Sequence, residues 1–252
     1  LLYPTINQKF HMKQSTNTIL MIRPASFRMN EETAVNNYFQ QKDGKTLSTN
    51  ELARKEFDAF VTKLRDKDIH VIVVDDDVNL DTPDALFPNN WVSFHENGTV
   101  GLYPMFAKNR RRERREEVVE QIEAQGYRVK NFIDYTDAEN DSVFLEGTGS
   151  LVLDRGNEKA YCAISDRANE DLLMEFCEDF EYFPIMFYAN QSHQGKRLPI
   201  YHTNVMMCIG TAIAVIASST IDDKKERKTV LDSLKADGKE IIEITEDQMN
   251  HF

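Results

Sequence analysis

The hydrophobic pattern at the start of the chain predicts a strand, a helix and a second strand. Short apolar runs at residues 18–22 and 69–74 are typical of buried strands. Between them, residues 50–67 carry apolar side chains at helical spacing, with Asn50 as a plausible N-cap. Residues 1–17 show no periodicity, so we expect a loose N-terminal extension there.

The rest of the chain repeats one arrangement. The first repeat is predicted to contain strands at residues 91–94 and 100–103, a helix at 110–124 and a strand at 127–133. Its two strands flank the turn Glu96-Asn97-Gly98, and Asn-Gly between apolar strands is a strong hairpin signal. Hairpin, helix and strand recur over residues 150–188 and 205–244. The unit is ββαβ, with a period of roughly 55 to 60 residues.

The number of repeats predicts an architecture. Each unit needs neighbours to cover its apolar faces, so a ring of such units should close on itself. The chain holds three complete units and a fourth without part of its hairpin, and it reads TEDQMNHF after Ile244. We therefore expect the sequence to end short of its natural domain. Unpaired strand edges would then favour association, for instance as a homodimer.

Composition restricts the kinds of partner. With 42 acidic and 30 basic residues the net charge is −12, which argues against a nucleic-acid-binding surface. The basic run at residues 108–115 is interrupted by Glu113, and we interpret it as the solvated start of a helix. No stretch approaches the roughly 18 apolar residues of a membrane span, and the amino terminus lacks the layout of a signal peptide. Neither a nucleic acid nor a membrane is therefore expected as a partner.

The cysteines indicate a reduced, cytoplasmic protein. Cys162, Cys177 and Cys208 lie in apolar surroundings without CxxC spacing, so neither a disulfide framework nor a metal site is predicted. We interpret all three as small buried hydrophobic residues. No cofactor is expected, because LEGTG at residues 145–149 lacks the lysine of a phosphate-binding loop.

Residues 198–219 place the polar trio His202, Thr203 and Asn204 at the mouth of an apolar hairpin. A histidine at such a rim is either a hydrogen-bonded structural group or a catalytic one, and composition does not decide between them. The remaining histidines have no partner that the sequence identifies, and they are interpreted as surface or loop residues. They are His70, His95, His193 and His251.

Several motifs resemble one superfamily. DALFPNN at residues 84–90, LEGTG at 145–149, ISDRAN at 164–169 and HTN at 202–204 occur in order at successive repeats. Together with the ββαβ unit they resemble the guanidino-group-modifying (pentein) superfamily, whose fold is a five-bladed α/β propeller. Its members include arginine deiminase, dimethylarginine dimethylaminohydrolase, succinylarginine dihydrolase and glycine amidinotransferase. The bacterial citrulline-utilisation hydrolases are most similar, through runs similar to MIRPASF, YHTNVMMCIG and the stretch from Phe87 to Arg115. The resemblance implies an α/β propeller domain over residues 18–252.

The resemblance also implies a chemistry and roles. In the superfamily a cysteine thiolate attacks the central carbon of a guanidinium or ureido group, and water hydrolyses the covalent intermediate. His202 matches the general acid and base, and Glu146 matches the acidic residue that orients it. The positions that match substrate-binding residues are Asp84, Asn89, Asn90, Arg167 and Asn204, with Arg167 matching an arginine that holds the α-carboxylate.

Two departures bear on the substrate. Asn90 and Asn204 stand where arginine deiminase has aspartates, and an amide can meet the oxygen of a neutral ureido group as well as an N–H. The pattern therefore favours citrulline over arginine, although asparagine at similar positions also occurs in the relative that acts on succinylarginine.

A third departure concerns the nucleophile. The superfamily carries its cysteine close to the carboxy terminus, beyond Phe252. Cys208 follows His202 by six residues, about 20 Å along a strand, so it is not expected to replace that cysteine. Three readings stay open: a cysteine-dependent hydrolase, an amidinotransferase, and a non-catalytic module that binds such amino acids.

Overall fold

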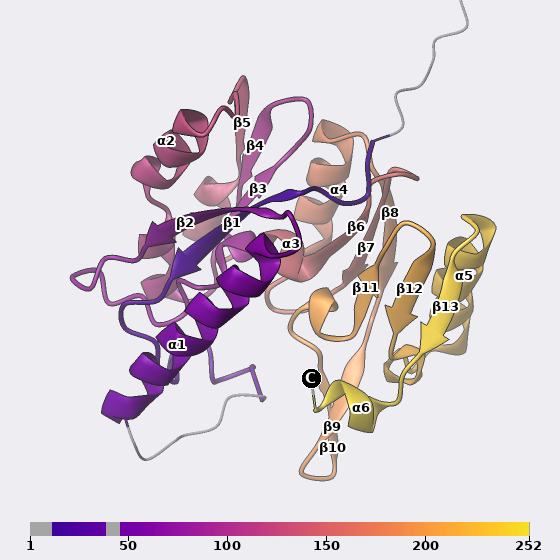
Figure 1. Cartoon of the computed structure of the whole chain (residues 1–252). Coiled ribbons are helices and arrows are strands. Elements are labelled where there is room, and N and C mark those ends of the chain that lie inside the picture. The colour runs from indigo at the N-terminus through magenta and orange to yellow at the C-terminus, as the bar shows by residue number, and fades with distance from the viewer. Residues whose placement is uncertain (1–11, 39–45, 252) are drawn as a thin grey trace, which may run out of the picture.

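The computed structural model describes residues 12–38 and 46–251, with residues 46–48 placed by their backbone alone. Within this part the chain forms an α/β fold of separate small sheets that follow one another in chain order (Figure 1). Three sheets have three strands each, and two sheets have two strands each. No continuous sheet crosses the described part of the molecule, as expected for a repeat of small units.

The three larger sheets share one topology. An antiparallel hairpin is followed by a helix and by a third strand that runs parallel to the second. The first unit contains β3 (Val92–Phe94), β4 (Thr99–Leu102), α2 (Glu116–Ala124) and β5 (Asn131–Asp134). The second contains β6 (Leu151–Asp154), β7 (Lys159–Ala163), α4 (Glu170–Asp179) and β8 (Phe183–Phe187). The third contains β11 (Met207–Ile209), β12 (Ile213–Ile216), α5 (Lys224–Ala236) and β13 (Glu240–Glu243). The predicted ββαβ repeat is confirmed.

The amino-terminal unit is smaller. Strands β1 (Thr18–Arg23) and β2 (His70–Asp75) pair in parallel and are joined through helix α1 (Thr46–Arg65). The helix begins before the predicted cap, so Asn50 lies inside it. There the Asn50 side chain accepts a hydrogen bond from Phe27 N at 2.9 Å and donates one to Ala25 O at 2.9 Å. Asn50 therefore ties the loop after β1 to α1.

Two other features differ from the predicted pattern. The predicted helix at 110–124 is divided into the 3-10 helix η2 (Lys108–Glu113) and α2. A further hairpin, β9 (Asn190–His193) and β10 (Lys196–Pro199), precedes the third unit; its polar sequence gives no alternating apolar pattern. The remaining short elements are η1 (Pro88–Asn90), η3 (Thr136–Asp141), α3 (Gly147–Ser150), η4 (Thr203–Val205), η5 (Ser218–Thr220) and α6 (Glu246–Met249).

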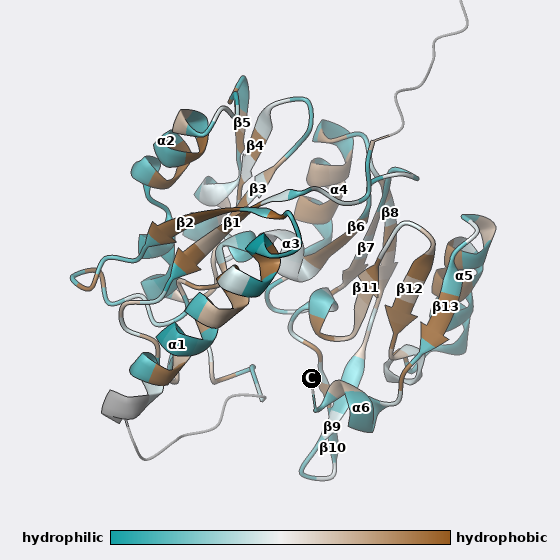
Figure 2. Ribbon diagram, viewed as in Figure 1, coloured by the Kyte–Doolittle hydropathy of each residue, from teal (hydrophilic) through white to brown (hydrophobic). Residues whose placement is uncertain are grey.

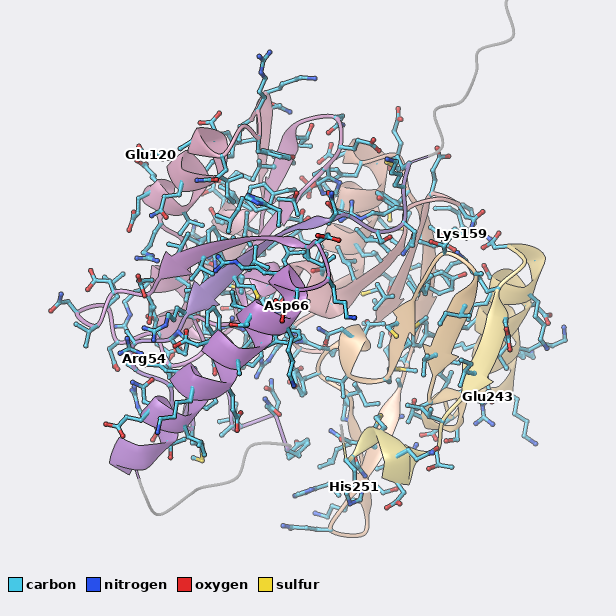
Figure 3. All side chains as sticks on the ribbon, in the orientation of Figure 1. Arg54, Asp66, Glu120, Lys159, Glu243 and His251 are labelled. Carbon is cyan, nitrogen blue, oxygen red and sulfur yellow. The ribbon has the colours of Figure 1, made fainter. Side chains whose placement is uncertain are left out.

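Apolar side chains join neighbouring units rather than filling each unit separately. The brown strands of Figure 2 lie inside the units, and α2, α4 and α5 turn their apolar residues toward them. One buried cluster contains Phe187 of the second unit together with Met206 and Leu234 of the third. Charged side chains such as Glu120 and Glu243 lie at the periphery (Figure 3). Each unit thus depends on the next for burial of its apolar faces.

Polar contacts also connect the units. Lys239 Nζ is buried and lies 3.1 Å from Asp154 Oδ2, between the second and third units. Of the predicted N-terminal extension, residues 1–11 lie outside the described part of the chain. Gln14, also in this extension, donates hydrogen bonds to Leu153 O and Ile209 O, at 2.9 and 3.0 Å. The extension is therefore attached to the second and third units at this residue. Among the described residues, no helix is both long and apolar enough to cross a membrane.

Candidate functional site

Two turns bring His202 and Glu146 together. His202 precedes η4, and Glu146 precedes α3; these two short elements contact each other. Thr203 Oγ1 fixes their spacing by donating to Ser150 O at 2.5 Å and accepting from Ala163 N at 2.7 Å. As a result His202 Nε2 lies 2.6 Å from Glu146 Oε2, and both side chains are buried.

Glu146 is surrounded by donors. Its Oε1 accepts a hydrogen bond from Phe106 N at 2.9 Å, and its Oε2 lies 3.5 Å from Arg167 Nη1. Burial acts to raise the pKa of this carboxyl. The charge of Arg167, the hydrogen bond from His202 and the charge of Arg110 outweigh burial, so the pKa falls to about 2. Glu146 is therefore ionised at neutral pH. Its Oε2 accepts a hydrogen bond from the N–H at Nε2 of His202.

His202 is neutral at pH 7. Burial lowers its pKa, and the hydrogen bond and negative charge of Glu146 oppose that shift without reversing it. Since Nε2 bears the proton that bonds Glu146, the basic nitrogen is Nδ1. This is the protonation state that a general base requires.

Asn90 approaches His202 across Gly149. A Cβ atom at Gly149 would lie 2.2 Å from Asn90 Nδ2 and 2.8 Å from His202 Nδ1, so the two groups are within about 5 Å of each other. Asn90 is buried at the end of η1, and its Oδ1 accepts from Arg110 Nη1 at 2.7 Å. Glycine at position 149 is thus what permits the amide and the imidazole to converge.

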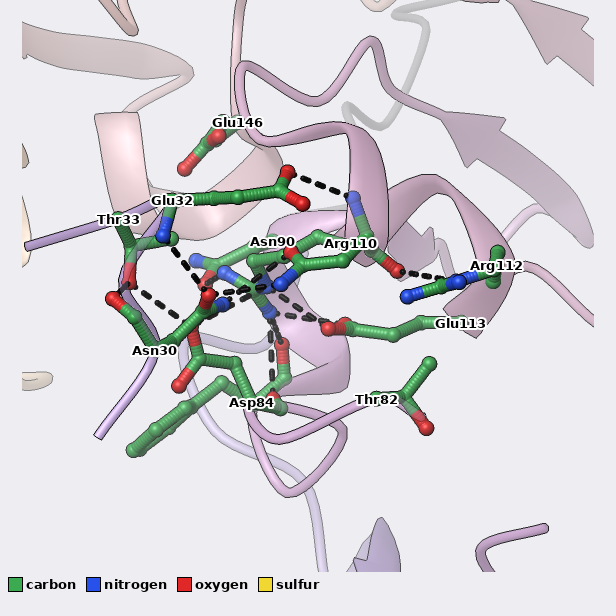
Figure 4. Close-up of polar contacts among 12 residues, drawn as sticks. Asn30, Glu32, Thr33, Thr82, Asp84, Asn90, Arg110, Arg112, Glu113 and Glu146 are labelled. Atoms are coloured by element: carbon green, nitrogen blue, oxygen red, sulfur yellow. Dashed lines mark hydrogen bonds and ion pairs between the residues drawn. The ribbon is translucent and has the colours of Figure 1, made fainter. Parts of the chain in front are cut away.

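Asp84 lies in a polar network beneath Asn90 (Figure 4). Its Oδ2 accepts from Asn30 Nδ2 at 2.8 Å and from Thr33 Oγ1 at 3.2 Å, and Arg110 Nε is 4.0 Å away. Both neighbours come from the loop after β1. The Asp84 carboxyl group is therefore buried beside the Arg110 guanidinium.

Arg167 is buried beside Glu146. Its Nη2 donates to Thr33 O at 2.9 Å and to Asn36 Oδ1, and its guanidinium carbon lies 4.9 Å from the ring centroid of Tyr201 and 5.5 Å from that of Phe106. Its Nε has no acceptor among the residues described. One donor of this arginine is left for a further acceptor.

The other two predicted positions are placed less centrally. Asn89 contributes its backbone oxygen, which accepts from Thr148 Oγ1 at 3.3 Å. Asn204 is exposed within η4, whereas Thr203 beside it is fully buried. A 3-10 helix turns neighbouring side chains in different directions, so Asn204 does not join His202 and Glu146.

Arg110 and Glu113 are site residues that the sequence interpretation placed wrongly in solvent. Both are buried, and they form a bidentate pair with distances of 2.8 and 2.9 Å. Burial raises the pKa of Glu113 to about 7 against the opposing charge of Arg110. The signal was present in the resemblance itself, because the run from Phe87 to Arg115 was part of it.

The cysteine interpretation was correct for two positions and wrong for one. Cys162 and Cys177 are buried, and burial raises the pKa of each thiol to about 12. Cys208 is exposed on β11. The path from His202 to Cys208 includes η4, so it is shorter than the extended strand that was assumed. No hydrogen bond joins the two in the described part of the chain.

The expectation that His95 lies at the surface was wrong. His95 is not a surface residue: it is buried, with Nε2 2.8 Å from Ser93 Oγ and Nδ1 3.4 Å from Arg155 Nη1. Among the described residues, no group of three or more His, Cys, Asp or Glu side chains could hold a metal ion.

A family model described as N,N dimethylarginine dimethylhydrolase, eukaryotic, matches residues 23–252. The chain belongs to this family. The predicted guanidino-group-modifying superfamily is thereby confirmed. A search of curated proteins gave no match.

Solved structures with the same fold are distant in sequence. The N-terminal domain of ArgZ, an arginine dihydrolase from the ornithine-ammonia cycle in Cyanobacteria, has a TM-score of 0.67 and 15% identity, over 90% of this chain and 75% of that one. Unliganded AgrE has a TM-score of 0.68 and 17% identity, over 92% of this chain and 30% of that one. The dimethylarginine dimethylaminohydrolase of Pseudomonas aeruginosa, in complex with citrulline, has a TM-score of 0.59 and 14% identity, over 96% and 79%. At these identities the similarity shows the fold.

Proposed function

We propose that the protein hydrolyses a carbon–nitrogen bond in the guanidino or ureido group of an arginine- or citrulline-type amino acid. The observation that carries the proposal is the buried pair of His202 and Glu146, with Asn90 facing it across Gly149. The similar proteins support the substrate class, since one is an arginine dihydrolase bound to its substrate and another binds citrulline.

In this mechanism a cysteine thiol first transfers its proton to neutral His202. Glu146 stabilises the resulting imidazolium, and the thiolate attacks the central carbon of the substrate. The carbon–nitrogen bond breaks as His202 protonates the leaving nitrogen. His202 then takes a proton from water, and the hydroxide attacks the same carbon. The carbon–sulfur bond breaks, and the departing thiolate takes the proton back from His202, which restores the thiol and the neutral imidazole. ArgZ has been captured covalently bonded to a reaction intermediate, which supports a covalent route.

Substrate binding is assigned to the residues around the pair. Asp84 and Asn90 face the reacting group, with the backbone of Asn89 beside them. The unpaired Nε of Arg167 suits an α-carboxylate. Asn204, which is exposed, contributes at the rim of the site.

None of the three cysteines in the described part of the chain is bonded to His202. Cys162 and Cys177 are held protonated by burial, and Cys208 makes no hydrogen bond to His202 within the described part. We propose that residues 18–252 belong to one five-bladed α/β propeller.

The test uses the protein expressed from its complete natural reading frame. Incubation with citrulline, arginine or dimethylarginine should release ornithine, citrulline, ammonia or dimethylamine, and His202→Asn should abolish release. His251→Gln is the matched control, because His251 is exposed near the carboxyl end. Lack of product from all three substrates would contradict the hydrolase.

A second function is supported by the absence of a thiol next to His202 among the described residues. On this alternative the site binds such amino acids without converting them. Titration calorimetry that shows saturable binding of citrulline or arginine without product formation would favour the binding module over the hydrolase.

A further inference from the structure

Arg110 decides which way the Asn90 amide faces. A guanidinium has five N–H donors and no acceptor. Arg110 Nη1 lies 2.7 Å from Asn90 Oδ1, so the amide oxygen must face the arginine. This orientation of the amide follows from chemistry. If the amide nitrogen faced Arg110 instead, two N–H donors would point at each other with no acceptor between them.

Arg110 is itself held in place (Figure 4). Its Nε and Nη2 donate to the two carboxylate oxygens of Glu113 at 2.8 and 2.9 Å, and Nη2 also donates to Phe87 O at 3.1 Å. The side chain is almost completely buried. Several fixed acceptors on one planar group leave it a single orientation.

The consequence lies on the opposite side of the amide. With Oδ1 turned to Arg110, Asn90 Nδ2 points to Gly149 and His202, as the 2.2 and 2.8 Å distances from the Gly149 Cβ position require. The reacting group of a ligand bound beside His202 therefore meets an N–H donor. An oxygen can accept from that donor, whereas the nitrogens of a guanidinium are all donors.

We propose that Arg110 is a positioning residue that locks Asn90 as a hydrogen-bond donor toward His202, so that the site selects a ureido oxygen over a guanidinium. The inference rests on the proposed function and deepens it by naming the substrate class. Selection is finite, because the negative charges of Asp84 and Glu146 lie near the site and attract a cation. Arg110 acts through Asn90.

The variant for testing is the double substitution Arg110→Met with Glu113→Gln, which removes the donor and also the negative charge of its bidentate partner Glu113. Calorimetry should give the wild type a higher affinity for citrulline than for arginine, and the double variant should lose that preference by about tenfold, as expected for one hydrogen bond between neutral groups. Arg128→Met, at an exposed arginine away from the site, is the control and should keep the preference. In an Asn90→Ala background the double substitution should change the preference no further.

A second readout needs no ligand. The side-chain amide resonance of Asn90, identified by its loss in Asn90→Asp, should show slow hydrogen exchange in the wild type and faster exchange in the double variant. An unchanged preference, or unchanged exchange, would overturn the role of Arg110. If the wild type binds neither amino acid, the proposed function fails, and the amide resonance still decides whether Arg110 locks Asn90.

Discussion

His202 Nε2 lies 2.6 Å from Glu146 Oε2 although 56 residues separate them, and both side chains are buried. The two residues belong to different ββαβ units, and Thr203 and Ser150 connect the turns that carry them. The pair therefore exists only when the second and third units are packed together. Its ionised carboxylate and neutral imidazole are set by the same packing.

Replacing Glu146 by Gln should lower turnover about 10²- to 10⁴-fold, the usual contribution of general acid–base catalysis. The neutral amide cannot stabilise an imidazolium, so the pKa of His202 should fall further and the acidic limb of the pH–rate profile should move to lower pH. Steady-state kinetics of the full-length protein across neutral pH measures both changes. Glu120→Gln, on the exposed side of α2, is the control; equal activity of the two variants would contradict the role of Glu146.

Gly149→Ala should damage the site directly. The new Cβ would lie 2.2 Å from Asn90 Nδ2 and 2.8 Å from His202, and Arg110 and Glu146 prevent either group from moving freely. We expect a loss of about 1–3 kcal/mol in unfolding free energy and at least about tenfold in turnover. Urea denaturation and kinetics give the two values. Gly156→Ala is the matched control, because its nearest neighbour, Met12 O, would be 3.7 Å away.

His95 should make the fold sensitive to acid. Burial and the charge of Arg155 lower its pKa to about 3. Between pH 6.5 and about pH 3, His95 is protonated in the unfolded chain but remains neutral in the folded chain. The free energy of unfolding therefore falls as the pH decreases through this range. The contribution is about 2 kcal/mol between pH 7 and pH 5. Denaturation at several pH values should show a smaller pH slope for His95→Gln than for the unmodified protein, and equal slopes would contradict this role of His95.

Lys239→Met should cost about 3–5 kcal/mol, because it leaves Asp154 as a buried, unpaired charge between the second and third units. Adding Asp154→Asn should recover part of the loss. Lys228→Met removes an exposed pair with Asp232 and should change stability by less than about 1 kcal/mol. Similar unfolding midpoints for the two lysine variants would show that the buried pair does not link the units.

Asn90→Asp should shift ligand preference toward arginine by about 1.5–3 kcal/mol, the range of a hydrogen bond to a charged group. One carboxylate oxygen would keep the contact with Arg110, and the other would face the site as an acceptor for a guanidinium. Dissociation constants for citrulline and arginine, measured for both proteins, give the shift directly. An unchanged ratio would remove Asn90 from the specificity of the site.

The sequence by itself determined the repeat and the central pair of the site. Strand and helix periodicities are local, so the ββαβ units could be predicted from residues that are neighbours in the chain. Ordered motifs identified Glu146, His202, Asp84 and Asn90 before any geometry was known, and the structure brings these residues together.

Only the tertiary structure decided the environment of those residues. Arg110 and Glu113 sit in a run of charges that is indistinguishable from a solvated helix, and they are buried because Asp84, Asn90 and the loop after β1 close over them. Likewise Cys208 is exposed although its sequence surroundings are apolar. His95 is buried because it stacks on Phe180, which is distant in sequence. Whether a charged or polar side chain is buried depends on which ββαβ units pack against it. The hydrophobic pattern of neighbouring residues in the sequence does not predict those contacts.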